Sequence, residues 1–303
     1  MAVPDRELVI PGARTAPPEP VRRPAPSPWA AARRRFVHSA SGLLGTAVLL
    51  VIVLIALFAN QVSPYDPLKQ NFRIERQAPD LAHLMGTDEF GRDVLSRVIW
   101  GARVSLQAGA VAASIALVAG LLLGMLAAYY GGRADALIMR LMDILLAFPY
   151  LLLAIAILAI IGPGLLTAMI AIGIVYTPSY ARVVRGAVLS VRARDYVLAA
   201  RALGASDARV MQQHILPNVL APVIVQATLN VGIAIIDTAG LSFLGLGTQP
   251  PTPDWGNMLA AGRSYLIDSP WMATFPGLAI LVTVLAFNLM GDALRDALDP
   301  RLR

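Results

Sequence analysis

Long apolar stretches alternate with short charged segments along this chain. Five stretches contain no Asp, Glu, Lys or Arg, and they cover residues 36–65, 104–132, 144–181, 210–236 and 269–291. A helix needs about 20 predominantly apolar residues to cross the hydrocarbon core of a bilayer. Four stretches therefore suit one membrane span each. The stretch 144–181 supplies parts of two spans, interrupted at Gly162-Pro163-Gly164.

The pattern predicts an all-α membrane protein with six transmembrane helices. Their expected bounds are residues 41–60, 104–128, 136–161, 165–181, 215–239 and 270–291. Each of the last four spans contains an internal or near-terminal proline, namely Pro149, Pro178, Pro222 and Pro276. Proline removes a backbone hydrogen bond and kinks a membrane helix. Four kinks favour a bundle that bends, as a transport pathway requires, and a static core of kinked helices is the alternative.

Composition and charge agree with a membrane protein and set its expected orientation. The chain is 57% hydrophobic and 15% charged, which is too apolar for an ordinary soluble domain. With the N-terminus inside, the cytoplasmic segments carry 18 of the 25 Lys and Arg residues. This positive-inside bias predicts that both termini and residues 182–214 are cytoplasmic. The net charge of +6 is explained by the arginines on the cytoplasmic side of the membrane, so no nucleic-acid partner is expected.

The sequence divides into four predicted regions. Residues 1–35 are rich in Pro and Arg without apolar periodicity, which predicts a disordered cytoplasmic tail. Residues 36–100 hold the first transmembrane helix and an extracytoplasmic loop. Residues 101–292 form the membrane core, and residues 293–303 a cytoplasmic C-terminal tail. The first apolar stretch lacks a small-x-small cleavage site, so we expect it to remain as an anchor.

Two extracytoplasmic segments are expected from this topology. Residues 60–103 contain six acidic and six basic side chains, a composition that favours a solvated loop with a short amphipathic helix. Residues 241–256 are stiffened by three prolines. Trp255 and Trp271 flank the end of this segment and are predicted to anchor at the membrane interface.

The residues that common enzyme chemistries require are missing. Lys69 is the only lysine, so the chain has no GxxxxGK[ST] phosphate loop. It has no cysteine, which excludes disulfides and thiol catalysis, and its three histidines show no metal-binding spacing. Within the spans, Arg140 and Asp143 are three residues apart and are expected to pair with each other. The role of Asp237, near the outer end of the fifth span, stays open between capping and gating.

Residues 194–217 form a polar island between two apolar stretches. They read as two short helices hinged at Gly204, with Asp195 predicted to cap the first and Ser206-Asp207 to open the second. One helical face is shared by Tyr196, Ala199, Ala200 and Leu203. Because two short helices cannot bury that face by themselves, it is a candidate docking surface for a cytoplasmic partner.

The island also resembles a known motif. Ala199-Ala200, Gly204 and Leu216-Pro217 are spaced as in the E-A-A-x3-G-x9-I-x-L-P coupling motif of type I ABC importer permeases. Leu198 stands in place of the Glu and His214 in place of the Ile. Three further blocks resemble C-type subunits of the dipeptide/oligopeptide/nickel permease family, the dipeptide permeases most of all. These blocks are residues 83–106, 242–256 and 275–300.

This resemblance implies a six-helix permease bundle whose cytoplasmic two-helix coupling segment binds an ATPase. The residues it assigns to that contact are Asp195, Tyr196, Ala199, Ala200, Leu203, Gly204, Leu216 and Pro217. It implies four partners in a bacterial cytoplasmic membrane: a homologous second permease, two ABC ATPases and an external substrate-binding protein. ATP and Mg²⁺ would bind the ATPases, leaving this chain without a cofactor. The implied activity is import of di- and oligopeptides.

Several alternatives stay open. The same machine carrying a nickel complex, glutathione or haem would share these sequence blocks. A membrane-embedded enzyme is a rival from another class, and a plain anchor or scaffold is a third. The sequence assigns no residue to the substrate pathway.

Overall fold

The computed structural model describes residues 28–298, and the secondary structure of this part consists of helices joined by loops, without a β-sheet. The helices are α1 (Pro28–Val37), α2 (Ala40–Leu57), α3 (Ala59–Val62), α4 (Val94–Tyr130), α5 (Gly132–Leu146), α6 (Tyr150–Ile161), α7 (Leu165–Arg192), α8 (Asp195–Ala202), α9 (Asp207–Arg209), α10 (Leu216–Phe243), α11 (Trp255–Arg263) and α12 (Trp271–Leu298). A 3₁₀ turn, η1 (Phe72–Ile74), and a π-helical turn, η2 (Val210–Ile215), complete the list. The predicted all-α architecture is confirmed.

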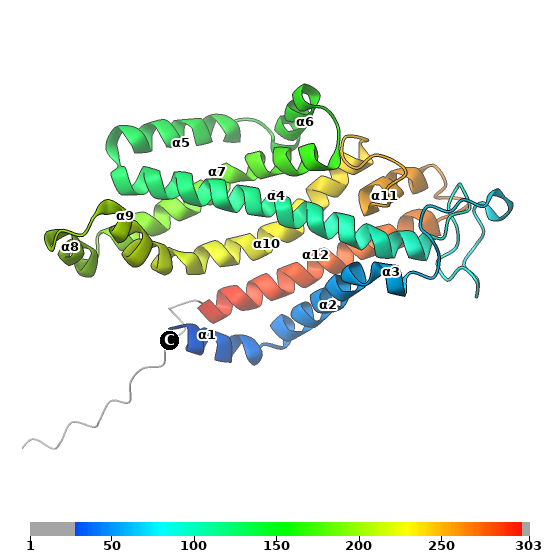
Figure 1. Ribbon diagram of the computed structural model, residues 1–303, viewed down its shortest axis with the longest axis horizontal. Helices are drawn as coiled ribbons and strands as arrows, with labels where there is room; N and C mark the ends of the chain where they lie inside the picture. Colours follow the sequence, from blue (N-terminus) through cyan, green and yellow to red (C-terminus); the bar gives the residue numbers. More distant parts are fainter. Residues whose placement is uncertain (1–27, 299–303) are drawn as a thin grey trace, which may run out of the picture.

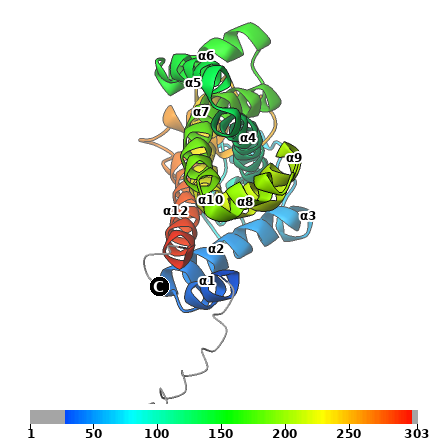
Figure 2. The ribbon, with the colours of Figure 1, turned by 90° about the vertical axis from the view of Figure 1, so that its left-hand side faces the viewer.

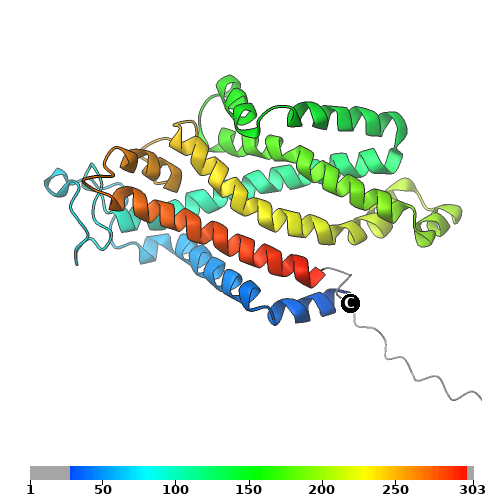
Figure 3. The same cartoon turned by 180° about the vertical axis from the view of Figure 1, so that it is seen from behind.

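Long helices run along a common direction and define two ends of the molecule. Figure 1 shows α8 and α9 at one end, called here the coupling end, and the loops around α11 at the other, called the loop end. Seen from the coupling end, α8 and α9 face the viewer beside α4 and α10 (Figure 2). From behind, α10 and α12 lie side by side, with α2 next to α12 (Figure 3). The two segments predicted to lie on opposite sides of a membrane are thus at opposite ends.

Five helices are long and apolar enough to cross a membrane, and the pair α5 and α6 makes a sixth if it is one span. The third predicted span, residues 136–161, is wrong as a continuous kinked helix. Between Leu146 and Tyr150 the chain leaves the helix, and the two pieces are bent by 94°. Pro149 sits at the break as the N-cap of α6. Proline cannot donate to the preceding turn and disfavours helical geometry in the residue before it, which explains a break at this point.

Helices α4 and α7 form the centre of the bundle through small residues. A Cβ added at Gly120 would lie 2.3 Å from the Cβ of Tyr180, and one at Gly124 would lie 2.5 Å from the Ala181 carbonyl oxygen. Close approach through glycines four residues apart is a common packing mode of membrane helices. The glycines therefore fix the distance between α4 and α7, which positions the coupling end.

The predicted disordered tail is wrong for residues 28–35, which belong to α1 and pack near α12. This segment reads PWAAARRRFV, and Ala and Arg are among the strongest helix formers, with Pro28 acceptable at the first helical position. Residues 1–27 of the predicted tail, and 299–303 of the C-terminal one, lie outside the described residues.

The loop end is an ordered cap and not the solvated loop that composition favoured. Thr87, Asp88 and Asp93 are each no more than 5% exposed. The predicted interfacial position of Trp255 is wrong, since its side chain is 2% exposed and its Nε1 donates to the Val98 carbonyl at 3.0 Å. The Nε1 of Trp271 donates to the Thr87 carbonyl at 3.0 Å. Both indoles tie the cap to the helices beneath it.

Candidate functional site

The coupling segment, residues 194–217, is built around a left-handed glycine. Gly204 has φ +83°, and two hydrogen bonds close the end of α8 around it: Gly204 N–H donates to the Arg201 carbonyl at 2.9 Å and Ala205 N–H to the Ala200 carbonyl at 3.1 Å. This pair of bonds is the Schellman motif, in which glycine is favoured because it has no Cβ. The geometry turns the chain sharply from α8 into α9, as the predicted hinge requires.

The predicted caps of these helices are only partly right. Asp195 is the first residue of α8, and the N-cap is Arg194, so the cap assigned to Asp195 is wrong. Its carboxylate still lies in the first turn, where it interacts favourably with the helix dipole. Ser206 is the N-cap of α9 without a side-chain bond. Asp207 instead accepts a 2.5 Å hydrogen bond from the Tyr129 hydroxyl, which ties the segment to the end of α4.

A buried apolar cluster holds the coupling segment rigidly against the bundle. Val197 of α8 and Val210 and Ile215 of η2 are fully buried. They pack with residues of α4, α7 and α10, which include Tyr129 and Val188. Because such a cluster resists deformation, a push on the segment reaches three long helices together.

The opposite face of the segment is open. Leu203 is 89% exposed, Leu198 52% and Tyr196 41%. Ala199 is exposed and Ala200 half-buried between them. The apolar residues predicted to share one face of this segment thus form a largely exposed surface in α8 and at its C-cap. It is called here the coupling surface and consists of Tyr196, Leu198, Ala199, Ala200 and Leu203. Within the described residues, no other element covers it.

The last two predicted coupling residues lie apart from this surface. Leu216 and Pro217 open α10, directly after η2. Leu216 is half-buried and packs against the apolar cluster, whereas Pro217 is exposed. The Tyr196 and His214 rings approach to 6.5 Å between centroids, so α8 and η2 are in contact.

The charged residues of the spans pair differently from the prediction. Asp143 binds Arg182 of α7 at 2.7 Å, and Asp135 binds Arg185 with two bonds of 2.6 Å. The predicted pair of Arg140 with Asp143 is wrong, because α5 lies along α7 and the arginines of α7 reach its carboxylates. Spacing along one helix could not reveal a partner on another.

Asp237 is buried within α10, at 6% exposure, and accepts a hydrogen bond from the Tyr176 hydroxyl of α7. The side chain of Tyr150, the first residue of α6, interacts with the same carboxylate. The capping role is not seen, since Asp237 lies inside its helix.

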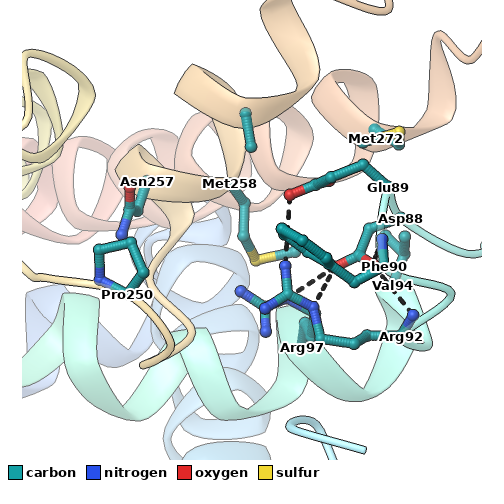
Figure 4. A pocket seen from close by; sticks show the side chains of 11 residues that line it. Asp88, Glu89, Phe90, Arg92, Val94, Arg97, Pro250, Asn257, Met258 and Met272 are labelled. Carbon is teal, nitrogen blue, oxygen red and sulfur yellow. Dashed lines mark hydrogen bonds and ion pairs between the residues drawn. The ribbon is translucent and has the colours of Figure 1, made fainter. Parts of the chain in front are cut away.

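The loop end contains a charged cavity of about 160 Å³ that the sequence reasoning missed (Figure 4). The Asp88 carboxylate accepts from Arg92 Nε at 2.6 Å, and Arg97 Nε lies 3.4 Å away. Glu89 Oε1 accepts from Arg92 at 3.3 Å, but its Oε2 is buried with no hydrogen-bond partner among the described residues. Burial and the Asp88 charge raise the pKa of the Glu89 carboxyl.

One signal in the sequence pointed to this cluster. Opposite charges recur within a dense run between Gly86 and Arg97, and acidic and basic side chains this close together can be buried as compensated pairs. Composition alone could not distinguish compensated burial from solvation. The cavity walls also need Pro250, Met258 and Met272, which are distant in the sequence.

Comparison with protein families and curated proteins gives a consistent result. A family described as "Binding-protein-dependent transport system inner membrane component" matches residues 120–303, and one described as "N-terminal TM domain of oligopeptide transport permease C" matches residues 27–79. A di/tripeptide transport system permease protein of Pseudomonas aeruginosa (strain UCBPP-PA14) is 53% identical over 92% of this chain and 94% of its own length.

Further relatives are similar over most of the chain. A dipeptide transport system permease protein of Alkalihalophilus pseudofirmus is 45% identical over 98% of both chains. A glutathione transport system permease protein of Pectobacterium atrosepticum is 44% identical over 91% of this chain and 92% of its own. Among solved structures, an inward-facing MetNI methionine ABC transporter has a TM-score of 0.55 at 20% identity, covering 68% of this chain and 97% of that one. At that identity the likeness concerns the fold.

Proposed function

Because this chain belongs to the family of binding-protein-dependent transport system inner membrane components, as a C-type permease of an ABC importer, we propose that its cargo is short peptides. The observation that carries this cargo is the 53% identity, over 92% of the chain, to a di/tripeptide permease. Glutathione permeases also match, at 44% identity. Glutathione is itself a modified tripeptide, so both names point to ligands with amide bonds and charged ends.

A permease of this kind is a membrane component, not an enzyme, and works with an ATPase and a binding protein. We propose that this chain pairs with a homologous second permease and two ATPase subunits, which bind ATP and Mg²⁺. Two features support the division of labour. The sequence has no phosphate loop, and the coupling surface offers a ready contact for another chain.

In the proposed mechanism, the coupling surface sits in a groove of one ATPase. Closure of the ATPase pair on ATP moves the coupling segment as a unit. The buried cluster around Val197 and Ile215 passes the motion to α4, α7 and α10. The permease pair then opens at the loop end, where the binding protein delivers the peptide. This assignment places the coupling end in the cytoplasm and the loop end outside, in line with the charge distribution.

Leu203→Glu tests the coupling surface. Leu203 is 89% exposed, so a charged side chain there should leave folding unchanged. Docking into an apolar groove would remove water from that charge, which costs free energy and weakens binding. An apolar anchor of an interface contributes about 2 kcal/mol or more, so we expect ATPase binding to weaken by about thirtyfold or more. ATP-driven dipeptide uptake into proteoliposomes holding the full complex should fall with it.

Leu81→Glu is the matched control, because Leu81 is 98% exposed at the loop end. It should leave ATPase binding at the wild-type level. Wild-type levels of ATPase binding and of uptake in Leu203→Glu would refute the coupling assignment. A wild-type complex that hydrolyses ATP but imports no peptide would instead refute the cargo.

A further inference from the structure

Asp237 is a carboxylate without a counter-charge in the membrane part of the bundle. It is 6% exposed and lies six residues, or about 9 Å, before the end of α10. Its hydrogen-bond donor is the neutral hydroxyl of Tyr176. Within residues 28–298, no arginine, lysine or histidine forms an ion pair with it. Asp135 and Asp143 differ in this respect, since each is paired with an arginine of α7.

Burying a carboxylate without a counter-charge in a membrane span costs free energy, so such a residue indicates a function. Ionisable side chains within membrane spans are rare, usually pair, and otherwise mark substrate or ion pathways. A hydroxyl donor satisfies one lone pair but leaves the negative charge. If the Tyr176 bond served only to join α7 to α10, a neutral amide would serve as well. A cation that reaches this carboxyl would stabilise its charged form.

The broken span lies beside this carboxylate. Tyr150 begins α6 directly after the break and is 52% exposed, as Phe148 in the break is 55% exposed. Backbone that leaves the helix at membrane depth is tolerated where it is buried in protein or lines a water-filled cavity. Discontinuous helices of this sort form binding sites in many transporters. The Tyr150 side chain thus connects the buried carboxylate with an accessible surface.

We infer that Asp237, with the Tyr176 and Tyr150 hydroxyls, receives the terminal ammonium group of a peptide in transit. This inference rests on the proposed function. An ammonium group has three donors, which match one carboxylate and two hydroxyl oxygens. Every peptide with a free amino end carries this group, whatever its side chains. A site for it lets the pathway bind peptides of varied sequence, because it reads only a feature they share.

Asp237→Asn in the full complex, reconstituted with its binding protein, tests the inference with labelled dialanine. Asparagine keeps the shape and the acceptor for Tyr176 but removes the charge. We expect binding-protein-stimulated ATPase activity to persist while dialanine transported per ATP falls at least tenfold. Asp237→Glu, which keeps the charge, should restore part of the transport. Tyr176→Phe, which keeps the charge but loses one hydroxyl, should reduce it less than Asp237→Asn.

Three results would overturn the inference. Wild-type transport by Asp237→Asn would show that the charge is not needed. Equal losses in Asp237→Asn and Tyr176→Phe would assign Asp237 to joining α7 and α10. Loss of the second permease from the purified Asp237→Asn complex would assign the missing cation to that subunit. All three results are measured against dialanine uptake by the wild-type complex. If the wild-type complex itself imports no peptide, the proposed cargo is refuted, and this outcome is distinct from the three above.

Discussion

Glu89 illustrates, at the scale of one residue, how burial without full pairing leaves a measurable mark. Its Oε1 accepts from Arg92, while Oε2 is buried and has no hydrogen-bond partner among the described residues. Glu89 is one of the residues that line the loop-end cavity (Figure 4). Burial, then the Asp88 charge, raises the pKa of the Glu89 carboxyl. The folded loop end therefore binds a proton more readily than the unfolded chain. Its stability must rise as the pH falls through this raised pKa, until the unfolded value of about 4.3 is reached.

We predict that Glu89→Gln removes this dependence. The glutamine is neutral at every pH, so the loop end should be more stable at pH 7 than in the wild type, and the gain on acidification should disappear. Hydrogen exchange of amides 83–93, measured from pH 7 downwards with correction for the intrinsic exchange rate, reports this local stability. Glu75→Gln is the control, because Glu75 is 42% exposed in a surface ion pair. An unchanged pH profile in the Glu89 variant would refute the prediction.

Individual residues also mark the limit of sequence reasoning. Gly204 was predictable, since a glycine between two helical patterns favours a left-handed turn. The partners of Asp143 and Asp237 were not, because they lie on α7, whose rotation relative to α5 and α10 is set by packing. One-dimensional spacing gives neighbours along a helix and is silent about neighbours across a bundle.

At the scale of elements, apolar length predicted the long helices well, and local breaks less well. The bilayer demands long apolar stretches, so five spans and the outline of a sixth follow from hydropathy. Whether Pro149 kinks or breaks its helix depends on what surrounds it. The ordered loop end was missed for a similar reason, since its stability comes from contacts with α11 and α12 that are distant in the sequence.

The contact between α4 and α7 yields a prediction at this scale. Gly120→Leu places a side chain where a Cβ alone would lie 2.3 Å from the Tyr180 Cβ. The helices must separate, and overpacking of this kind costs about 1–3 kcal/mol or more. We expect a lower melting temperature of the detergent-purified complex and weaker ATPase stimulation by the binding protein. Gly186→Leu on α7, where nothing lies within 4 Å, should change neither.

At the scale of the whole molecule, the two ends differ in chemistry. The coupling end carries an exposed apolar surface over a buried apolar cluster, and the loop end carries buried charged side chains. These two ends are the opposite ends of the long helices (Figure 1). The charge distribution predicts that the first faces the cytoplasm. The orientation is open to a direct test, because the sequence has no native cysteine to interfere.

We predict that Thr252→Cys reacts with a membrane-impermeant maleimide added to intact cells, and that Ser206→Cys does not. Both side chains are exposed. Ser206 directly precedes α9 and Thr252 lies three residues before α11, and these two helices are at opposite ends of the molecule (Figure 1). After the membrane is permeabilised, both should react to the same extent, which controls for accessibility. Labelling of the Ser206 variant alone in intact cells would reverse the orientation and remove the basis for ATPase docking.

The π-helical turn η2 has a consequence for how length changes act on this protein. A π-helical turn holds one more residue than an α-helical turn of the same height. Loss of one residue within η2, such as Gln212, would let α9 and α10 join as a regular helix with little change in their relative rotation. Loss of one residue from the regular part of α10 would instead rotate everything before it by about 100° about the α10 axis. Leu203 would then point away from the proposed ATPase contact, and a cross-link from that position would report the change. The π-helical turn is thus the place where this segment tolerates a change of one residue in length, and the regular helix after it is not.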